Sequence, residues 1–215
     1  MPHPGVMPDS DRINCCDTET SGVISLNTTV RPFSRWNARM SKRYEHVSLR
    51  IPLEEREGLL DESKSRVTNL NALATRILTK YVSFDRMMEL EGPVVLTPYL
   101  LSNLANASAV NALVETARVH SGRFAKHAFA LYRVEPTLDN LITRYFEPMG
   151  LFSGWFRFSC GLDPLGESLV FEHNLGENWT KFLECYITGV IRSVLGTEPE
   201  VRSDLGLILA HVGRG

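Results

Sequence analysis

The feature that most constrains this chain is a short alternating run that ends in proline. Apolar side chains alternate with polar ones in His46-Val47-Ser48-Leu49-Arg50-Ile51-Pro52. A period of two is typical of a β-strand with one buried and one polar face. Pro52 ends the strand because it has no N–H to donate, and its fixed φ suits the first turn of a helix. The pattern therefore predicts a strand over residues 46–51 that leads directly into a helix.

Two helices are expected after this strand. The first begins at Pro52 or just after it, and acidic side chains at Glu54 and Glu55 suit the positive end of its dipole. A turn over 67–69 leads to a second helix, whose apolar side chains recur every three or four residues: Leu70, Leu73, Ile77, Leu78 and Tyr81. We expect this helix to fray beyond Phe84, and the Glu91-Gly92-Pro93 break predicts a domain boundary.

One strand and two helices cannot enclose a core, and an isolated strand leaves its backbone N–H and C=O groups unpaired. We therefore expect a dimer, in which two copies of the strand pair antiparallel and four helices pack behind them. Such an arrangement buries Val47, Leu49 and Ile51 and turns the intervening polar residues outward. A two-stranded ribbon of this kind fits the DNA major groove. The alternative is that residues 44–84 are a strand and two helices of one ordinary domain.

Residues 44–84 resemble the ribbon-helix-helix family, the fold of the Arc and methionine repressors, in their polar-apolar-Arg-apolar-Pro order. The resemblance implies that His46, Ser48 and Arg50 contact base edges, with Arg50 suited to bidentate contact with guanine. It also implies that backbone amides at Asn69 and Asn71, where the second helix begins, hold a DNA phosphate.

Two residues of the first helix depart from the family's pattern. Gly58 lies in the middle of the helix, where glycine costs about 1 kcal/mol relative to alanine. Ser63 is expected to face inward among apolar side chains. Neither residue breaks the pattern.

The charge distribution is uneven although the chain of 215 residues has a net charge of only −2. Residues 1–43 are expected to be a disordered tail, because prolines, glycines and mixed charges follow no lasting period. Its end is a basic arm, from which Arg39, Lys42 and Arg43 are expected to contact DNA phosphates. Two interpretations remain open: the arm folds along the phosphate backbone, or its charge is incidental.

The remaining residues, 94–213, predict an α+β domain of helices packed on an antiparallel sheet. Residues 94–96 are a short strand or an extended approach, and Thr97-Pro98 begins a helix in two pieces broken near Asn106. The period of residues 122–134 fits a helix or a strand. Another helix is expected from Pro136-Thr137, stopped by Pro148 and Gly150.

After residue 150 the period changes from helical to alternating. Two hairpins are expected, one from strands at 155–160 and 168–172 and one from strands at 200–202 and 207–212. Between them lies a long amphipathic helix closed by Gly196. It begins with the block His173-Asn174-Leu175-Gly176-Glu177-Asn178-Trp179-Thr180, which resembles the C-terminal half of prokaryotic regulator-like proteins. That resemblance implies architecture and no particular activity.

The sequence offers little support for enzymatic chemistry. His173 beside Glu172 suggests metal or acid–base work, or instead a helix cap tied to the preceding strand. No HExxH, Cys-rich, phosphate-loop or GxSxG motif occurs, so we expect no enzyme activity, no metal and no cofactor. Cys185 is expected to be a small buried thiol on an apolar helix face.

The four cysteines show no CxxC spacing and no disulfide framework, which indicates a reducing compartment. With no signal region and no membrane-spanning run, we expect a cytoplasmic protein without a membrane partner. The function predicted is a sequence-specific transcriptional regulator that binds double-stranded DNA as a homodimer or higher homo-oligomer. Its C-terminal domain would bind an unknown small ligand or serve further assembly. The alternative is a sensor or protein-interaction protein that does not bind DNA.

Overall fold

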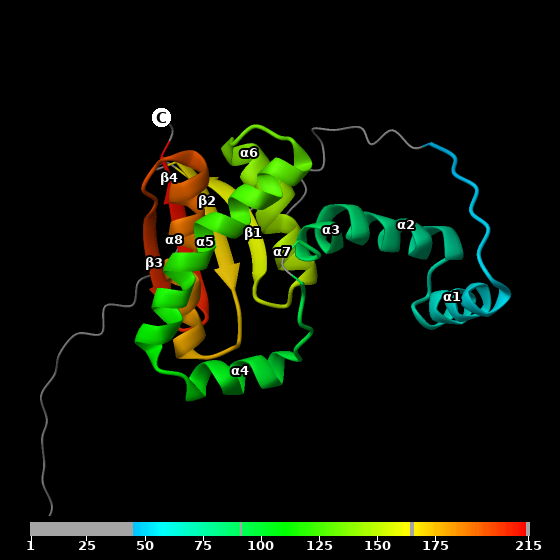
Figure 1. Cartoon of the computed structure of the whole chain (residues 1–215), viewed down its shortest axis with the longest axis horizontal. Helices are drawn as coiled ribbons and strands as arrows, with labels where there is room; N and C mark the ends of the chain where they lie inside the picture. The colour runs from blue at the N-terminus through cyan, green and yellow to red at the C-terminus, as the bar shows by residue number, and fades with distance from the viewer. Residues whose placement is uncertain (1–44, 91, 164–165, 214–215) are drawn as a thin grey trace, which may run out of the picture.

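The computed structural model describes residues 45–90, 92–163 and 166–213. In this part of the chain, helices α1 (Leu53–Ser65) and α2 (Leu70–Lys80) come first, and the π-helical turn η2 (Tyr81–Asp85) and α3 (Arg86–Met88) continue the path of α2 (Figure 1). The remaining helical elements are α4 (Pro98–Ala107), α5 (Val110–Tyr132), α6 (Leu138–Leu141), η3 (Ile142–Phe146), α7 (Glu147–Phe152) and α8 (Glu177–Leu195). The predicted break near Asn106 therefore separates α4 from α5.

Residues 157–212 contribute four strands to one antiparallel sheet of order β1-β2-β4-β3. The strands are β1 (Arg157–Asp163), β2 (Gly166–Glu172), β3 (Glu200–Asp204) and β4 (Leu207–Val212). Both expected hairpins form, and β2 also pairs with β4 across the α8 connection, with Leu169 opposite Ala210 and Phe171 opposite Ile208. The expectation of helices packed on an antiparallel sheet is confirmed.

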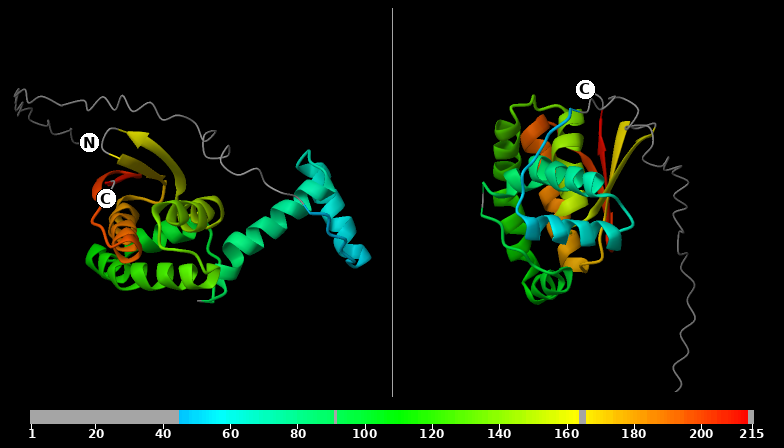
Figure 2. Two further views of the ribbon diagram at one scale, coloured as in Figure 1. Left: turned by 90° about the horizontal axis from the view of Figure 1, so that it is seen from above. Right: turned by 90° about the vertical axis from the view of Figure 1, so that its right-hand side faces the viewer.

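The C-terminal region has three layers, with the sheet on one side, α8 in the middle and α5 on the outside (Figure 2). The core lies between the sheet and the helices that cover it, and Leu169, Phe171 and Ile208 are fully buried there. The ring of Phe171 lies 5.0 Å from that of Phe146 and 5.1 Å from that of Phe158, centroid to centroid. This aromatic packing contributes to the stability of the region, because burial of large apolar side chains favours folding.

The helix that was expected to stop at Pro148 and Gly150 continues through both to Phe152, so that prediction was wrong. Pro148 lies in the first turn of α7, where a missing N–H is tolerated. Gly150 permits close packing, since a Cβ there would lie 2.7 Å from the Phe158 Cβ. Residues 122–134, whose period was ambiguous, belong to α5 as far as Tyr132.

The second helix does not fray beyond Phe84 as expected. Phe84 and Met87 are 7% and 0% exposed, and the Phe84 ring lies 5.7 Å from that of Phe152 in α7. The Tyr132 hydroxyl at the end of α5 also donates a 2.8 Å hydrogen bond to the Ser83 carbonyl. Residues 83–88, which the predicted boundary assigns to the N-terminal domain, thus pack into the C-terminal core.

Candidate nucleic-acid interface

The expected base-reading segment, residues 45–52, adopts neither helix nor strand in the single chain. His46, Ser48 and Arg50 are all exposed. The apolar side chains that alternate with them are also uncovered, with Val47 67%, Leu49 60% and Ile51 43% exposed. No partner within the described part of the chain therefore covers either side of this segment.

Helices α1 and α2 pack against each other and bury very little. Leu73 is 6% exposed, and the inward-facing Ser63 is 4% exposed. The Ser63 hydroxyl donates a 2.8 Å hydrogen bond to the Leu60 carbonyl, which explains how a polar side chain is accommodated there. Ile77, Leu78, Tyr81 and Val82 keep about half of their surface exposed, at 46%, 49%, 46% and 52%.

Asn69 is the N-cap of α2, and its side-chain oxygen accepts a 2.8 Å hydrogen bond from the Ala72 amide. Asn71 is exposed in the same first turn, which contains no acidic residue. Amides that the cap leaves free at a helix N-terminus favour an anion. Asn69 has a structural role beside any phosphate contact, and the remaining amides of Leu70 and Asn71 point out of the helix end.

The other expected phosphate contacts, Arg39, Lys42 and Arg43, lie outside the described residues. So does the predicted tail over residues 1–43.

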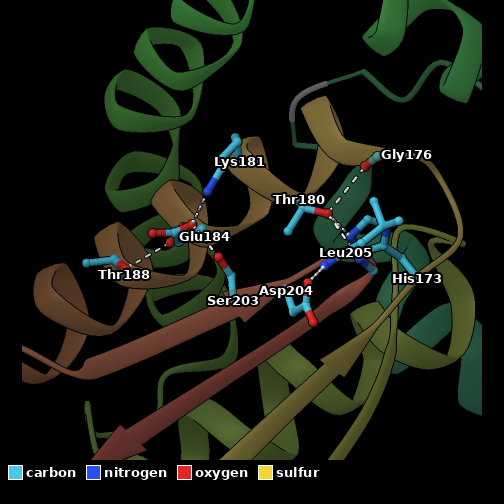
Figure 3. A network of polar contacts seen from close by, with 10 residues as sticks. His173, Gly176, Thr180, Lys181, Glu184, Thr188, Ser203, Asp204 and Leu205 are labelled. Atoms are coloured by element: carbon cyan, nitrogen blue, oxygen red, sulfur yellow. Dashed lines mark hydrogen bonds and ion pairs between the residues drawn. The ribbon is translucent and has the colours of Figure 1, made fainter. Parts of the chain in front are cut away.

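His173 joins the sheet to the start of α8 through a hydrogen-bond network (Figure 3). Its Nδ1 accepts a 3.1 Å hydrogen bond from the Leu175 amide, and its Nε2 lies 3.1 Å from the Thr180 hydroxyl. The Gly206 amide, in the β3–β4 turn, donates to that same hydroxyl at 3.2 Å. Since Nδ1 accepts, a neutral ring carries its proton on Nε2, and burial lowers the pKa of His173. His173 therefore links the start of α8 to the β3–β4 turn. It does not cap the helix as expected, because Gly176 occupies the N-cap position.

The rest of this block also holds the C-terminal domain together. The Asn178 side chain donates hydrogen bonds to the carbonyls of Ala105 and Ser108 at 3.1 and 3.2 Å, at the end of α4. Gly176 has a φ of 95°, and a Cβ there would lie 2.6 Å from the Asn106 side-chain oxygen. Residues 173–180 thus connect the start of α8 to the end of α4, and the spacing of these residues in the sequence does not reveal this contact.

Among residues 45–90, 92–163 and 166–213, no three His, Cys, Asp or Glu side chains gather as metal ligands. Within the same ranges, no helix has the length and apolar character needed to cross a bilayer. Cys185, expected as a buried thiol, is half-buried and faces α5, where it donates a 3.5 Å hydrogen bond to the Val114 carbonyl.

No protein-family model, curated protein or solved structure matches this chain.

Proposed function

We propose that this protein is a sequence-specific DNA-binding transcriptional regulator that acts as a dimer, with residues 46–50 of each chain in the major groove. The observation that carries the proposal is the uncovered apolar side of residues 47–53. Val47, Leu49 and Leu53 are each at least 60% exposed, immediately before two helices that bury almost nothing. Exposed apolar surface of this extent is typical of an interaction site.

The backbone of this segment supports pairing with a second copy. Among the described residues, no backbone hydrogen bond involves residues 45–51. A run of unpaired N–H and C=O groups is a template for another strand. An antiparallel pair of two copies satisfies these groups and, because side chains alternate, puts Val47, Leu49 and Ile51 of both chains on one side.

The other side of such a ribbon supports the assignment to DNA. It carries His46, Ser48 and Arg50, and the Arg50 guanidinium has no ion pair in the described part of the chain. A guanidinium free of carboxylates is available for the two acceptors of a guanine edge. The uncapped amides at the start of α2 supply the phosphate contact that fixes the position of the ribbon.

The test is selection of DNA sequences from a random library with the full chain, followed by binding measurements on the selected site and on unrelated DNA. Arg50→Ala is expected to weaken binding to the selected site by about 1–3 kcal/mol and to change binding to unrelated DNA little. Arg157→Ala is the matched control, because that arginine is 85% exposed on β1, far from the proposed interface. Equal losses on both DNAs would remove Arg50 from base reading.

A second candidate, a protein-interaction module that does not bind DNA, is favoured by a further exposed apolar patch. Val94, Val95 and Tyr99, between α3 and the first turn of α4, are 81%, 93% and 78% exposed. Failure of the library selection to enrich any sequence, for a protein shown to be folded, would favour this candidate.

A further inference from the structure

A cavity of about 500 Å³ lies between α5 and α8 on the C-terminal domain. The two helices run side by side there in both views of Figure 2. A volume of this size suits a small molecule. The cavity lining includes Val114, Arg118 and Ser121 from α5 and Glu184, Cys185 and Arg192 from α8.

The charges of the lining are mostly positive, with Arg118, Lys181 and Arg192 against the single carboxylate of Glu184. Glu184 accepts a 2.7 Å hydrogen bond from Ser203 on β3, and Figure 3 shows its carboxylate directed toward that strand. The Glu184 carboxylate is therefore held on the side of the cavity that faces the sheet.

The two arginines are paired only with exposed carboxylates outside the lining. Arg118 contacts Glu115 and Arg192 contacts Glu198, and all four side chains are more than half exposed. Exposed ion pairs contribute little stability because water screens them. Both guanidiniums can therefore exchange these partners for an anionic group that enters the cavity.

The arginines flank the cavity from different helices. Arg118 lies on α5 and Arg192 on α8, and each is near enough to the Cys185 thiol to lower its pKa, although burial outweighs them and raises that pKa. The Cys185 thiol therefore lies within electrostatic range of both arginines.

Ser121 supplies a hydrogen-bonding group at the base of the cavity. It is 1% exposed, and among the described residues its hydroxyl has no hydrogen bond. Its position depends on Gly189, since a Cβ at that residue would lie 2.1 Å from the Ser121 oxygen. The Ser121 oxygen keeps access to the cavity, so a ligand oxygen there can accept a hydrogen bond from this hydroxyl.

We propose that this cavity is a binding site for a small molecule bearing a carboxylate or phosphate group, which lies between Arg118 and Arg192 and accepts a hydrogen bond from Ser121. The rest of the molecule lies along Val114 and Cys185. The site goes beyond DNA binding and does not depend on it.

The test uses the full chain, with inorganic phosphate and acetate as separate probes. Binding is followed by the amide resonances of Gly122 and Gly189 in nitrogen-15-labelled protein during titration to 20 mM of each probe, about twenty times a 1 mM dissociation constant. Saturable shifts of both resonances by either probe are expected. Stronger binding of phosphate or of acetate identifies which of the two groups the site prefers.

Arg118→Gln with Arg192→Gln is expected to weaken the binding at least tenfold, and Ser121→Ala to weaken it less. Arg202→Gln is the matched control, because Arg202 is an exposed, ion-paired arginine of the same domain that does not line the cavity. It should leave the binding unchanged. Shifts that do not saturate, or an equal loss in Arg202→Gln, would overturn the proposal by showing only general attraction of anions.

Discussion

The N-terminal helices and the C-terminal domain differ in how completely each buries its own apolar residues. Of residues 45–82, only Ser63 and Leu73 are buried. In the C-terminal domain, Leu169, Phe171 and Ile187 are all fully buried between the sheet and its helices. The sequences of both regions carry clear amphipathic patterns. Only the C-terminal region has enough helices and strands to bury the apolar side chains of its core within one chain.

The difference shows that α1 and α2 leave most of their apolar surface uncovered in a single chain, and the proposed dimer would cover it. Burial of apolar surface is the dominant favourable contribution to folding, and α1 and α2 alone gain too little of it. The C-terminal region, in contrast, buries its apolar side chains within the single chain, and its core includes Phe84 and Met87 from the end of the N-terminal helices. Stability should therefore depend on protein concentration in the first region and not in the second.

The largest expected effect comes from Leu49→Asp, compared with Leu162→Asp. The two leucines are equally uncovered in the single chain, 60% and 61% exposed. If a second chain covers Leu49, an unpaired charge there costs several kcal/mol and unfolds the N-terminal module, whereas Leu162→Asp on β1 should have a small effect. Far-ultraviolet circular dichroism and sedimentation of both variants give the comparison. Similar, small effects of the two substitutions would contradict a shared N-terminal core.

A loss of about 3–5 kcal/mol is expected for Phe171→Ala, which removes a fully buried ring that packs against Phe146 in η3 and Phe158 in β1. The free energy of unfolding of the C-terminal domain, measured in urea, should fall by the same amount at every protein concentration. A loss that varies with concentration would show that this domain too needs a second copy.

At the junction of the two regions, Tyr132→Phe removes the hydrogen bond to the Ser83 carbonyl. The expected loss is about 0.5–1.5 kcal/mol. Hydrogen exchange should become faster in residues 83–88 and stay unchanged in residues 70–76. Equal acceleration in both segments would mean that the whole helix, and not its last turns, belongs to the C-terminal unit.

The smallest effect concerns pH and His173. Because burial lowers the pKa of His173 in the folded state, the neutral ring stabilises the domain fully above the unfolded value of about 6.5. This contribution is lost as pH falls from there through the lowered pKa, since a protonated Nδ1 would face the Leu175 amide. Thermal unfolding between pH 8 and 5 should show a weaker pH dependence in His173→Gln than in the natural protein. An identical dependence would exclude His173 as its source.

The elements that could be predicted from the sequence are those set by local patterns. The wide apolar stripe of α8, its end at Gly196 and the turn residues at 163–166 and 204–206 place the last helix and both hairpins correctly. Contacts between distant residues could not be predicted in this way. Phe84 joins the core through Phe152, and Gly122 of α5 lies against Ser193, where a Cβ would come within 3.0 Å of the Ser193 Cβ.

The two candidate sites also differ in whether a local sequence pattern predicts them. Alternation and Pro52 predict where His46, Ser48 and Arg50 lie along the chain, although whether they face DNA depends on a second molecule. The α5–α8 cavity joins Arg118 to Arg192, which are far apart in sequence and belong to no motif. The local sequence signal for this cavity was the pair of small residues Ser121 and Gly122 in α5. Helical periodicity does not distinguish such a pair from small residues on an ordinary helix surface.

Hydrogen exchange of residues 45–52 in the full chain, measured over a range of protein concentrations, tests the central claim most directly. If two copies of this segment pair as strands, the amides of alternate residues from 46 to 51 should become protected as the dimer forms, and Leu49→Asp should abolish the protection. Rapid exchange of these amides at every concentration, in a protein whose C-terminal domain is folded, would contradict the account.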